Sequence, residues 1–136
     1  MTINASMVKE LRDRSGAGMM ECKRALVETD GNIEKAIEHL RKIGAAKAAK
    51  KAGRIAAEGK IIVVSVKDLT VMVEINSETD FVAKDSNFLE FCELVAKTIV
   101  EQAPDSAEYL QACTCSDGKT IGDKRLELIS VVGENI

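Results

Sequence analysis

The chain is poor in aromatic residues and in the residues that carry most enzyme chemistry. It has no tryptophan, one tyrosine, three phenylalanines and a single histidine among 136 residues. So few aromatic rings disfavour a surface that stacks the bases of single-stranded nucleic acid, and we expect no nucleic-acid partner. With one proline and nine glycines against a hydrophobic content of 46%, the composition also excludes a disordered or collagen-like chain. The sequence therefore predicts a globular fold with an aliphatic core.

Long apolar runs and a secretory leader are missing as well. The first residues carry no basic stretch followed by an apolar one, and no 18 consecutive apolar residues occur. We therefore expect a cytoplasmic protein with no membrane partner. The four cysteines have no framework spacing, and Cys113 and Cys115 are too close for the common C-x2-C zinc pattern. No metal site and no cofactor are predicted.

Charge divides the chain into two parts. Residues 1–59 hold 12 Lys and Arg against 8 Asp and Glu, a net charge of +4, whereas residues 60–136 hold 7 against 14, a net charge of −7. Opposite signs favour two modules. We place these modules at residues 1–54 and 55–136.

Residues 1–54 have the pattern of short helices. Asn4 and Asn32 each precede an apolar-periodic segment and suit helix caps. Gly44 is expected to end the third helix, because glycine is the commonest residue just past a helix end. Residues 45–54 are rich in alanine and lysine and predict a helical connector with little packing of its own.

From residue 60 the period changes to that of strands. Two β-branched segments, 61–66 and 71–75, are separated by four residues and predict an antiparallel hairpin. Alternation in the second segment should place Met72 and Glu74 on one face. Three helical segments follow, with Asp105 expected to cap the middle one. The fold class is therefore α+β: an N-terminal three-helix bundle, a helical connector, then a small antiparallel sheet packed with helices.

Catalytic constellations are absent from the sequence. It has one histidine, no Gly-x-Ser-x-Gly motif and no glycine-rich phosphate loop, so we do not expect an enzyme. A basic run at 47–54 is better explained as a solvated helix end than as a phosphate site.

Two adjacent methionines follow a Gly-Ala-Gly turn. Successive helical residues point about 100° apart, so Met19 and Met20 cannot both face the same small core. An exposed methionine suits a partner contact, whereas a core position for both through the turn stays an open alternative.

A second unusual segment, 79–85, places two apolar side chains between carboxylates. Phe81 and Val82 stand between Asp80 and Asp85. Either both fold back onto the following helix as a hydrophobic staple, or they form an exposed apolar wedge.

Three stretches together closely resemble bacterial elongation factor Ts. They are residues 11–26 (LRDRSGAGMMECKRAL), 47–53 and 76–85 (NSETDFVAKD), and the similarity continues to Ile136. The resemblance implies an N-terminal module like a ubiquitin-associated domain, joined to the first half of the factor's core. It also implies guanine nucleotide exchange on elongation factor Tu during translation elongation.

The same resemblance implies which residues meet the G domain of elongation factor Tu. The exchange loop, which would enter beside the partner's magnesium site, would be Asp80, Phe81, Val82 and Ala83. The N-terminal module would hold a helix of that domain through Arg12, Met19, Met20, Lys23 and Lys51. The family continues past Ile136, so we expect a fragment with an open sheet edge that a homodimer can cover. The alternative is a helical module that binds a peptide or protein without exchanging nucleotide.

Overall fold

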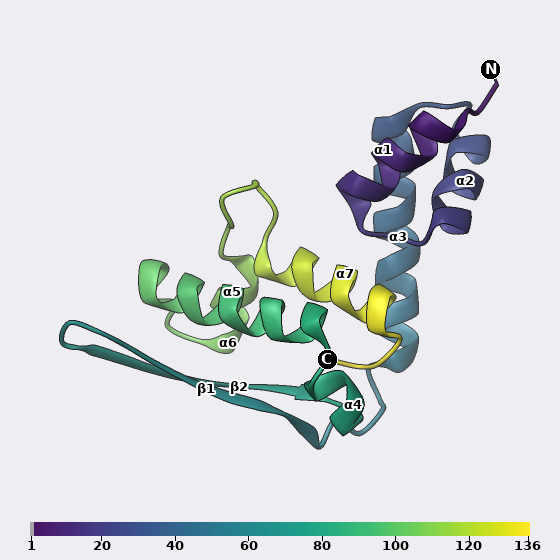
Figure 1. The fold of residues 1–136 in the computed structure, drawn as a ribbon. Helices are drawn as coiled ribbons and strands as arrows, with labels where there is room; N and C mark the ends of the chain where they lie inside the picture. The colour runs from purple at the N-terminus through teal and green to yellow at the C-terminus, as the bar shows by residue number, and fades with distance from the viewer. Residues whose placement is uncertain (1) are drawn as a thin grey trace.

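Residues 2–136, the part that the computed structural model describes, form seven helices and one two-stranded antiparallel sheet (Figure 1). The side chains of Asn4 and Asn32 accept hydrogen bonds from the backbone N–H groups of Met7 and Lys35, so both predicted caps are confirmed. The N-terminal bundle consists of α1 (Ala5–Ser15), α2 (Met19–Glu28) and α3 (Ile33–Lys51). Its aliphatic core contains Val8, Leu11, Cys22, Ala25, Leu26 and Ala36.

The third helix is longer than the sequence predicts. α3 continues through Gly44 to Lys51, so the prediction that Gly44 ends it is wrong, and the connector is helical but continuous with the bundle. A Cβ atom at position 44 would lie 3.2 Å from the Oγ atom of Ser130. The missing side chain therefore permits a close approach to the last helix. α3 belongs both to the bundle and to the part that follows it.

The sheet is the predicted hairpin, with longer strands and a tighter connection. β1 (Glu58–Val66) pairs antiparallel with β2 (Leu69–Ser77) along their whole length. Two residues join them rather than the four expected, and the first, Lys67, has a φ of 53°. Met72 and Glu74 lie on one face as predicted, and that face is exposed. The other face of β2 is turned toward the core.

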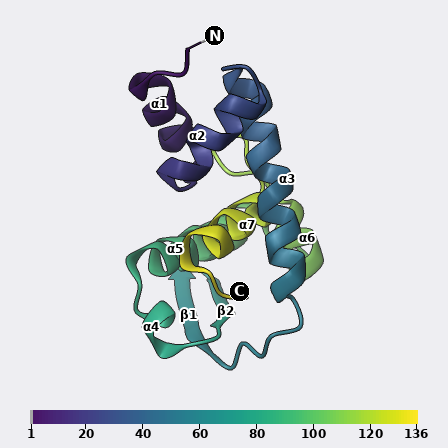
Figure 2. The same cartoon turned by 90° about the vertical axis from the view of Figure 1, so that its right-hand side faces the viewer.

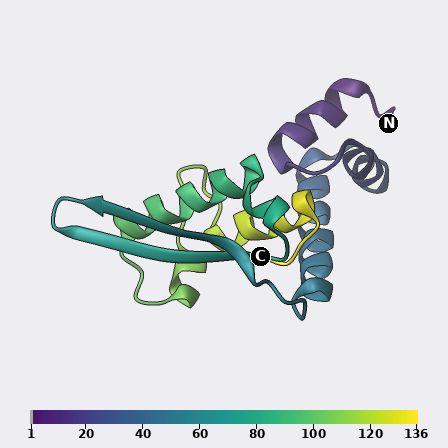
Figure 3. The same ribbon diagram turned by 60° about the horizontal axis from the view of Figure 1, so that its bottom comes forward.

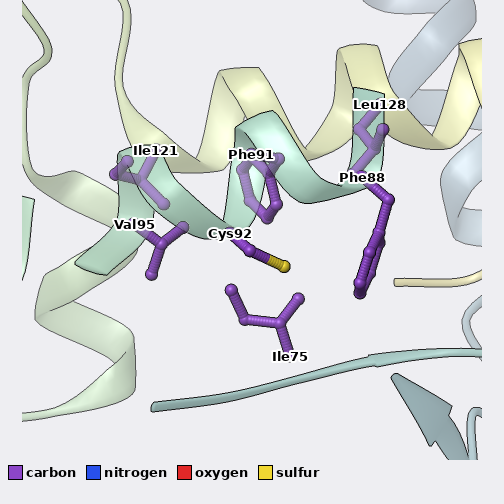
Figure 4. Close-up of a cluster of buried hydrophobic side chains, with 7 residues drawn as sticks. All are labelled: Ile75, Phe88, Phe91, Cys92, Val95, Ile121 and Leu128. Carbon is purple, nitrogen blue, oxygen red and sulfur yellow. The ribbon is translucent and has the colours of Figure 1, made fainter. Parts of the chain in front are cut away.

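Three further helices follow; the first covers the inner face of the hairpin, the third packs on the first, and the second packs on the third. Their bounds are α5 (Ser86–Gln102), α6 (Ala107–Ala112) and α7 (Ile121–Val132). Asp85 caps α5, whereas Ser106 caps α6, so the prediction of Asp105 as that cap is wrong. Figure 4 shows the resulting core, in which α5 side chains lie between the strand and α7; its members are Ile75, Phe88, Phe91, Cys92, Val95, Ile121 and Leu128.

The elements form an elongated molecule of the predicted α+β class. α5 runs along the hairpin, α7 packs against α5, and the bundle lies at the end remote from the hairpin tip (Figures 1 and 3). α3 packs against α7 and so joins the two parts, while Lys119 Nζ donates to the carbonyl of Arg14 at 3.1 Å. Across residues 2–136, every helix is too short or too polar to traverse a lipid bilayer.

Candidate functional site

A single helical turn follows the hairpin and carries the most distinctive side chains of the chain. α4 (Asp80–Ala83) begins where the sequence predicts only a loop. Thr79 caps it by accepting a hydrogen bond from the N–H of Val82 at 3.4 Å. Just before the cap, the fully buried Ser77 donates to the carbonyl of Thr79 at 2.9 Å. The start of the turn is therefore anchored by a buried side chain.

The two apolar side chains of α4 point in opposite directions. Phe81 is 83% exposed, whereas Val82 packs against the core and Ala83 is buried. The two alternatives left open by the sequence are thus divided between neighbours: Val82 folds back and Phe81 forms the exposed wedge. Because Phe81 stands on an anchored turn, its backbone position is fixed while its ring is exposed to solvent.

A carboxylate accompanies the exposed ring. Asp80 is exposed and lies 3.5 Å from the Lys84 ammonium, an i,i+4 pair at the surface. Exposed pairs of this kind contribute about 0–1 kcal/mol, so a partner group can displace the lysine at little cost. α4 therefore offers an apolar ring together with an available negative charge. This combination can enter a cleft and compete for a bound cation.

The segment after α7 supports the base of α4. The carboxylate of Glu134 accepts hydrogen bonds from the N–H groups of Glu78 and Thr79, both at 3.0 Å, and from the Thr79 hydroxyl at 2.6 Å. Sequence reasoning did not find this residue, because it lies 55 positions from the turn that it contacts. Local sequence patterns do not predict such a long-range contact.

The second candidate surface lies on α2. Met19 and Met20 are 57% and 67% exposed, and Lys23 is exposed one turn later. Since the buried residues of α2 are Cys22, Ala25 and Leu26, the open alternative of a core position for both methionines is not what the structure shows. At 100° per residue, Met19, Met20 and Lys23 fall on one exposed face of the helix.

Val27 belongs to the same face, and sequence reasoning missed it. It is 58% exposed and follows Met20 by seven residues, which brings it back to nearly the same direction. That i, i+7 spacing was the available signal. The four residues, Met19, Met20, Lys23 and Val27, are called the α2 face below.

An ion pair fixes the start of α2 relative to α3. The ammonium of Lys47 bonds to the carboxylate of Glu21 and lowers the pKa of that carboxyl below its usual value, against the opposing effect of burial. Glu21 directly follows Met20 in the chain. The α2 face is therefore held on α3 by a charged contact as well as by the bundle core.

The candidate partner-binding residues do not form one cluster. Arg12 is exposed on α1, and Lys51 is the last residue of α3. The start of α2 bonds to Lys47, one turn before Lys51, whereas α4 lies below the C-terminal end of α3 in both views (Figures 1 and 2). The structure thus presents two separate surfaces, the α2 face beside α3 and the Phe81 turn past the end of that helix.

Metal and thiol chemistry have little support within the described residues. In the range 2–136, no three His, Cys, Asp or Glu side chains are grouped in a way that could hold a metal ion. Burial raises the pKa of the Cys92 thiol to about 11 and raises that of Cys115. Raised pKa values keep these thiols protonated and unreactive at neutral pH.

Comparison with known proteins gives one consistent family. The model of the family described as Elongation factor TS matches residues 78–136. Elongation factor Ts of Thioalkalivibrio sulfidiphilus is 57% identical over 138 aligned residues, which include all of this chain and 47% of the relative. The factor of Xanthomonas oryzae pv. oryzae is 54% identical over all of this chain and 47% of its own length. That of Alcanivorax borkumensis is 54% identical over 96% of this chain and 46% of its own length.

The chain spans about half the length of the curated relatives that it matches. Within that half, the aligned region includes both candidate surfaces, the α2 face and the Phe81 turn, together with α3. Together with the family match over the segment that contains α4, this identity shows that the chain belongs to the elongation factor Ts family.

Proposed function

We propose that this chain promotes the release of GDP from elongation factor Tu during translation elongation. The observation that carries the proposal is the side chain of Phe81, which is 83% exposed on a turn anchored by the buried Ser77 side chain. In this proposal Phe81 enters the G domain of the partner beside its magnesium site, and Asp80 brings a negative charge next to the ion. The magnesium ion belongs to the partner.

The proposed exchange is a binding reaction without a covalent step. A factor that binds the nucleotide-free partner more tightly weakens nucleotide binding by the same ratio, because the coupling between two ligands is reciprocal. Fully burying a phenylalanine contributes about 1.5–3 kcal/mol. With 83% of Phe81 available, its burial supplies about 1.2–2.5 kcal/mol, or about eight- to seventyfold in affinity. The remaining coupling must come from Asp80 and from the anchoring surface.

The α2 face supplies that anchor in the proposal. It places two flexible apolar side chains, Met19 and Met20, beside the positive charge of Lys23. Methionine adapts its shape to a partner surface, and a central apolar contact is typical of residues that dominate binding energy. Arg12 and Lys51 would add contacts to the same G domain.

The test compares GDP release from elongation factor Tu with the chain and with its Phe81→Ala variant. We expect Phe81→Ala to slow release by about eight- to seventyfold at limiting concentration while leaving the circular dichroism spectrum unchanged. Tyr109→Ala is the matched control, because Tyr109 is an exposed aromatic residue, 67% accessible, on α6. Equal release rates for the wild-type chain and Phe81→Ala would contradict the assigned role of the ring.

The same assay separates exchange from simple binding. A helical module that only binds its partner would associate with elongation factor Tu without accelerating GDP release, at any concentration of the chain. We further propose that the chain is not an enzyme, acts in the cytoplasm, requires no cofactor and needs neither nucleic acid nor membrane. Since β1 and β2 are both edge strands, a second copy can pair with the hairpin, and we propose a homodimer as an association of the isolated chain.

A further inference from the structure

The segment that follows α7 meets two distant parts of the chain. α7 ends at Gly133, whose φ of 75° turns the backbone away from the helix axis. In Figure 1 the C-terminus lies beside α4 and below the end of α7. The next two residues, Glu134 and Asn135, form hydrogen bonds with residues 52–54 and 78–79. The end of the described chain is therefore an internal contact of the fold.

Two glutamates form reciprocal bonds at this contact. Glu134 accepts from the backbone and side chain of residues 78–79, as described above, and Glu78 in turn accepts the N–H of Asn135 at 2.7 Å. Glu78 also lies 3.6 Å from the guanidinium of Arg54. Hydrogen bonds to an ionised acceptor are about twice as strong as those between neutral groups. These bonds therefore hold residues 78–79 and 134–135 in one position relative to each other.

Asn135 extends the contact to the end of α3. Its Nδ2 atom donates to the carbonyl of Arg54 at 2.9 Å and to that of Ala52 at 3.4 Å. Since Lys51 ends α3, these bonds join the helix end to the base of α4 through one side chain. We call residues 134 and 135, with their bonds to 52–54 and 78–79, the C-terminal bracket.

A turn as short as α4 depends on such external support. Helix nucleation is unfavourable, and four residues gain too few internal hydrogen bonds to offset the loss of backbone entropy. The cap is Thr79, whose hydroxyl accepts from Val82 and donates to Glu134. Removing the Glu134 carboxylate would release this hydroxyl together with two backbone N–H groups. The orientation of Phe81, two residues later, depends on all three bonds.

We propose that Glu134 is a positioning residue that holds α4 in the orientation in which Phe81 engages the partner. The inference rests on the proposed exchange function and adds a residue that does not itself contact the nucleotide site. Preorganising a loop reduces the entropy that is lost when it binds. Without the Glu134 bonds, the turn must be ordered during association, and the energy from burying Phe81 is reduced by that cost.

The first measurement compares GDP release with Glu134→Ala, Glu134→Gln and the control Glu90→Ala. We expect Glu134→Ala to slow release about tenfold at limiting concentration, which corresponds to about 1.4 kcal/mol. The Glu134→Gln variant keeps one carbonyl oxygen able to accept both backbone N–H groups, so it should restore most of the rate. Glu90 is exposed on α5, and its replacement should leave the rate unchanged. Wild-type rates for Glu134→Ala would overturn the proposal.

A double-mutant cycle distinguishes positioning from a general loss of stability. If Glu134 acts by orienting Phe81, then Phe81→Ala should slow release by a smaller factor in the Glu134→Ala background than in the wild-type chain. Met20→Ala, on the remote α2 face, should slow it by the same factor in both backgrounds. Equal factors for Phe81→Ala in the two backgrounds would show that Glu134 does not act through the ring.

Amide hydrogen exchange of the chain alone tests the inference independently of elongation factor Tu. Glu134→Ala should accelerate exchange at Val82 and Ala83 while leaving Leu11, in the bundle core, as protected as in the wild type. If Glu134→Ala does not fold, Glu134→Gln carries the same measurement with a smaller expected change. If the wild-type chain fails to accelerate GDP release from elongation factor Tu, the exchange function is refuted. If the α4 amides are as protected in Glu134→Ala as in the wild type, the positioning role is refuted.

Discussion

Replacing the two methionines of the α2 face should weaken binding to elongation factor Tu without unfolding the bundle. Fully burying a methionine contributes about 1.5–3 kcal/mol. Met20 is 67% exposed, so about 1–2 kcal/mol remains to be gained at the interface, or about five- to thirtyfold in affinity. Met19 is 57% exposed and has about 0.9–1.7 kcal/mol available. The affinity of the double variant Met19→Ala, Met20→Ala for elongation factor Tu should thus fall by at most about 25- to 500-fold.

The assay is isothermal titration calorimetry with nucleotide-free elongation factor Tu. The matched control is Met72→Ala, because Met72 is 71% exposed and lies on the outer face of the hairpin, away from α2. The control removes the same apolar surface from a position that the proposal does not assign to the interface, and its affinity should change less than about twofold. Thermal unfolding of each variant should match that of the wild type, since neither α2 methionine is buried.

Three outcomes would refute this reasoning. Unchanged affinity of the double variant, with an unchanged unfolding temperature, would remove the α2 face from the interface. A large fall in unfolding temperature would instead show that the methionines stabilise the bundle, contrary to their exposure. An equal loss of affinity for Met72→Ala would show that the apolar area removed matters and its location does not.

Two further predictions concern stability and thiol chemistry. Gly59→Ala should lower the free energy of unfolding in urea by about 1–3 kcal/mol or more, because its Cβ would lie 2.1 Å from the carbonyl oxygen of Ile75 at a φ of 139°. The control Gly53→Ala, whose Cβ would have no atom within 4 Å, should change that free energy by less than about 1 kcal/mol. Equal urea midpoints for the two variants would contradict the strain argument. Burial raises the pKa of Cys92 to about 11, so the folded chain keeps the thiol proton after the unfolded chain has lost it. The free energy of unfolding should then fall as pH rises from about 9 to about 11, and an alkylating reagent at pH 9 should modify Cys92 faster after unfolding; a fast native reaction would be inconsistent with the raised pKa.

The parts of the fold that were predictable are those set by neighbouring residues. Asn4 and Asn32 cap helices because their side chains reach N–H groups three residues away, and the sequence contains that whole interaction. The exposed position of Met72 follows from strand alternation in the same way. Local chemistry of this kind is visible without any knowledge of tertiary contacts.

One error arose where a distant contact replaced the local signal, and two where the residue types left the local geometry open. Gly44 was expected to end α3 because glycine often follows a helix, but here the lack of a side chain allows Ser130 of α7 to approach closely. The hairpin connection has no glycine or asparagine, so the positive φ of Lys67 was not indicated by its residue type. Asp105 and Ser106 are both good caps, and only the geometry selects Ser106.

The candidate site shows the same division. The segment around Phe81 is unusual enough to be identified from sequence, but the pattern could not decide which of Phe81 and Val82 faces solvent, since both are apolar and adjacent. The bonds from Glu134 decide the geometry of that turn, and they join residues 55 and 56 positions apart. A search for charged residues near Phe81 in the sequence would not reach it.

The continuity of α3 changes what the anchor can do in the proposed mechanism. A connector at 45–54 that bent freely would let the α2 face raise only the local concentration of the Phe81 turn near its target. A continuous helix of 19 residues, bonded to α2 through Lys47 and Glu21, instead fixes the position of the α2 face relative to the part of the chain that follows α3. The contact with α7 and the bonds of Asn135 to the carbonyls of Ala52 and Arg54 hold the far end of that helix against the base of α4. Binding at the α2 face then determines where Phe81 meets the partner. The binding energies of the two surfaces therefore favour the same conformation of the partner.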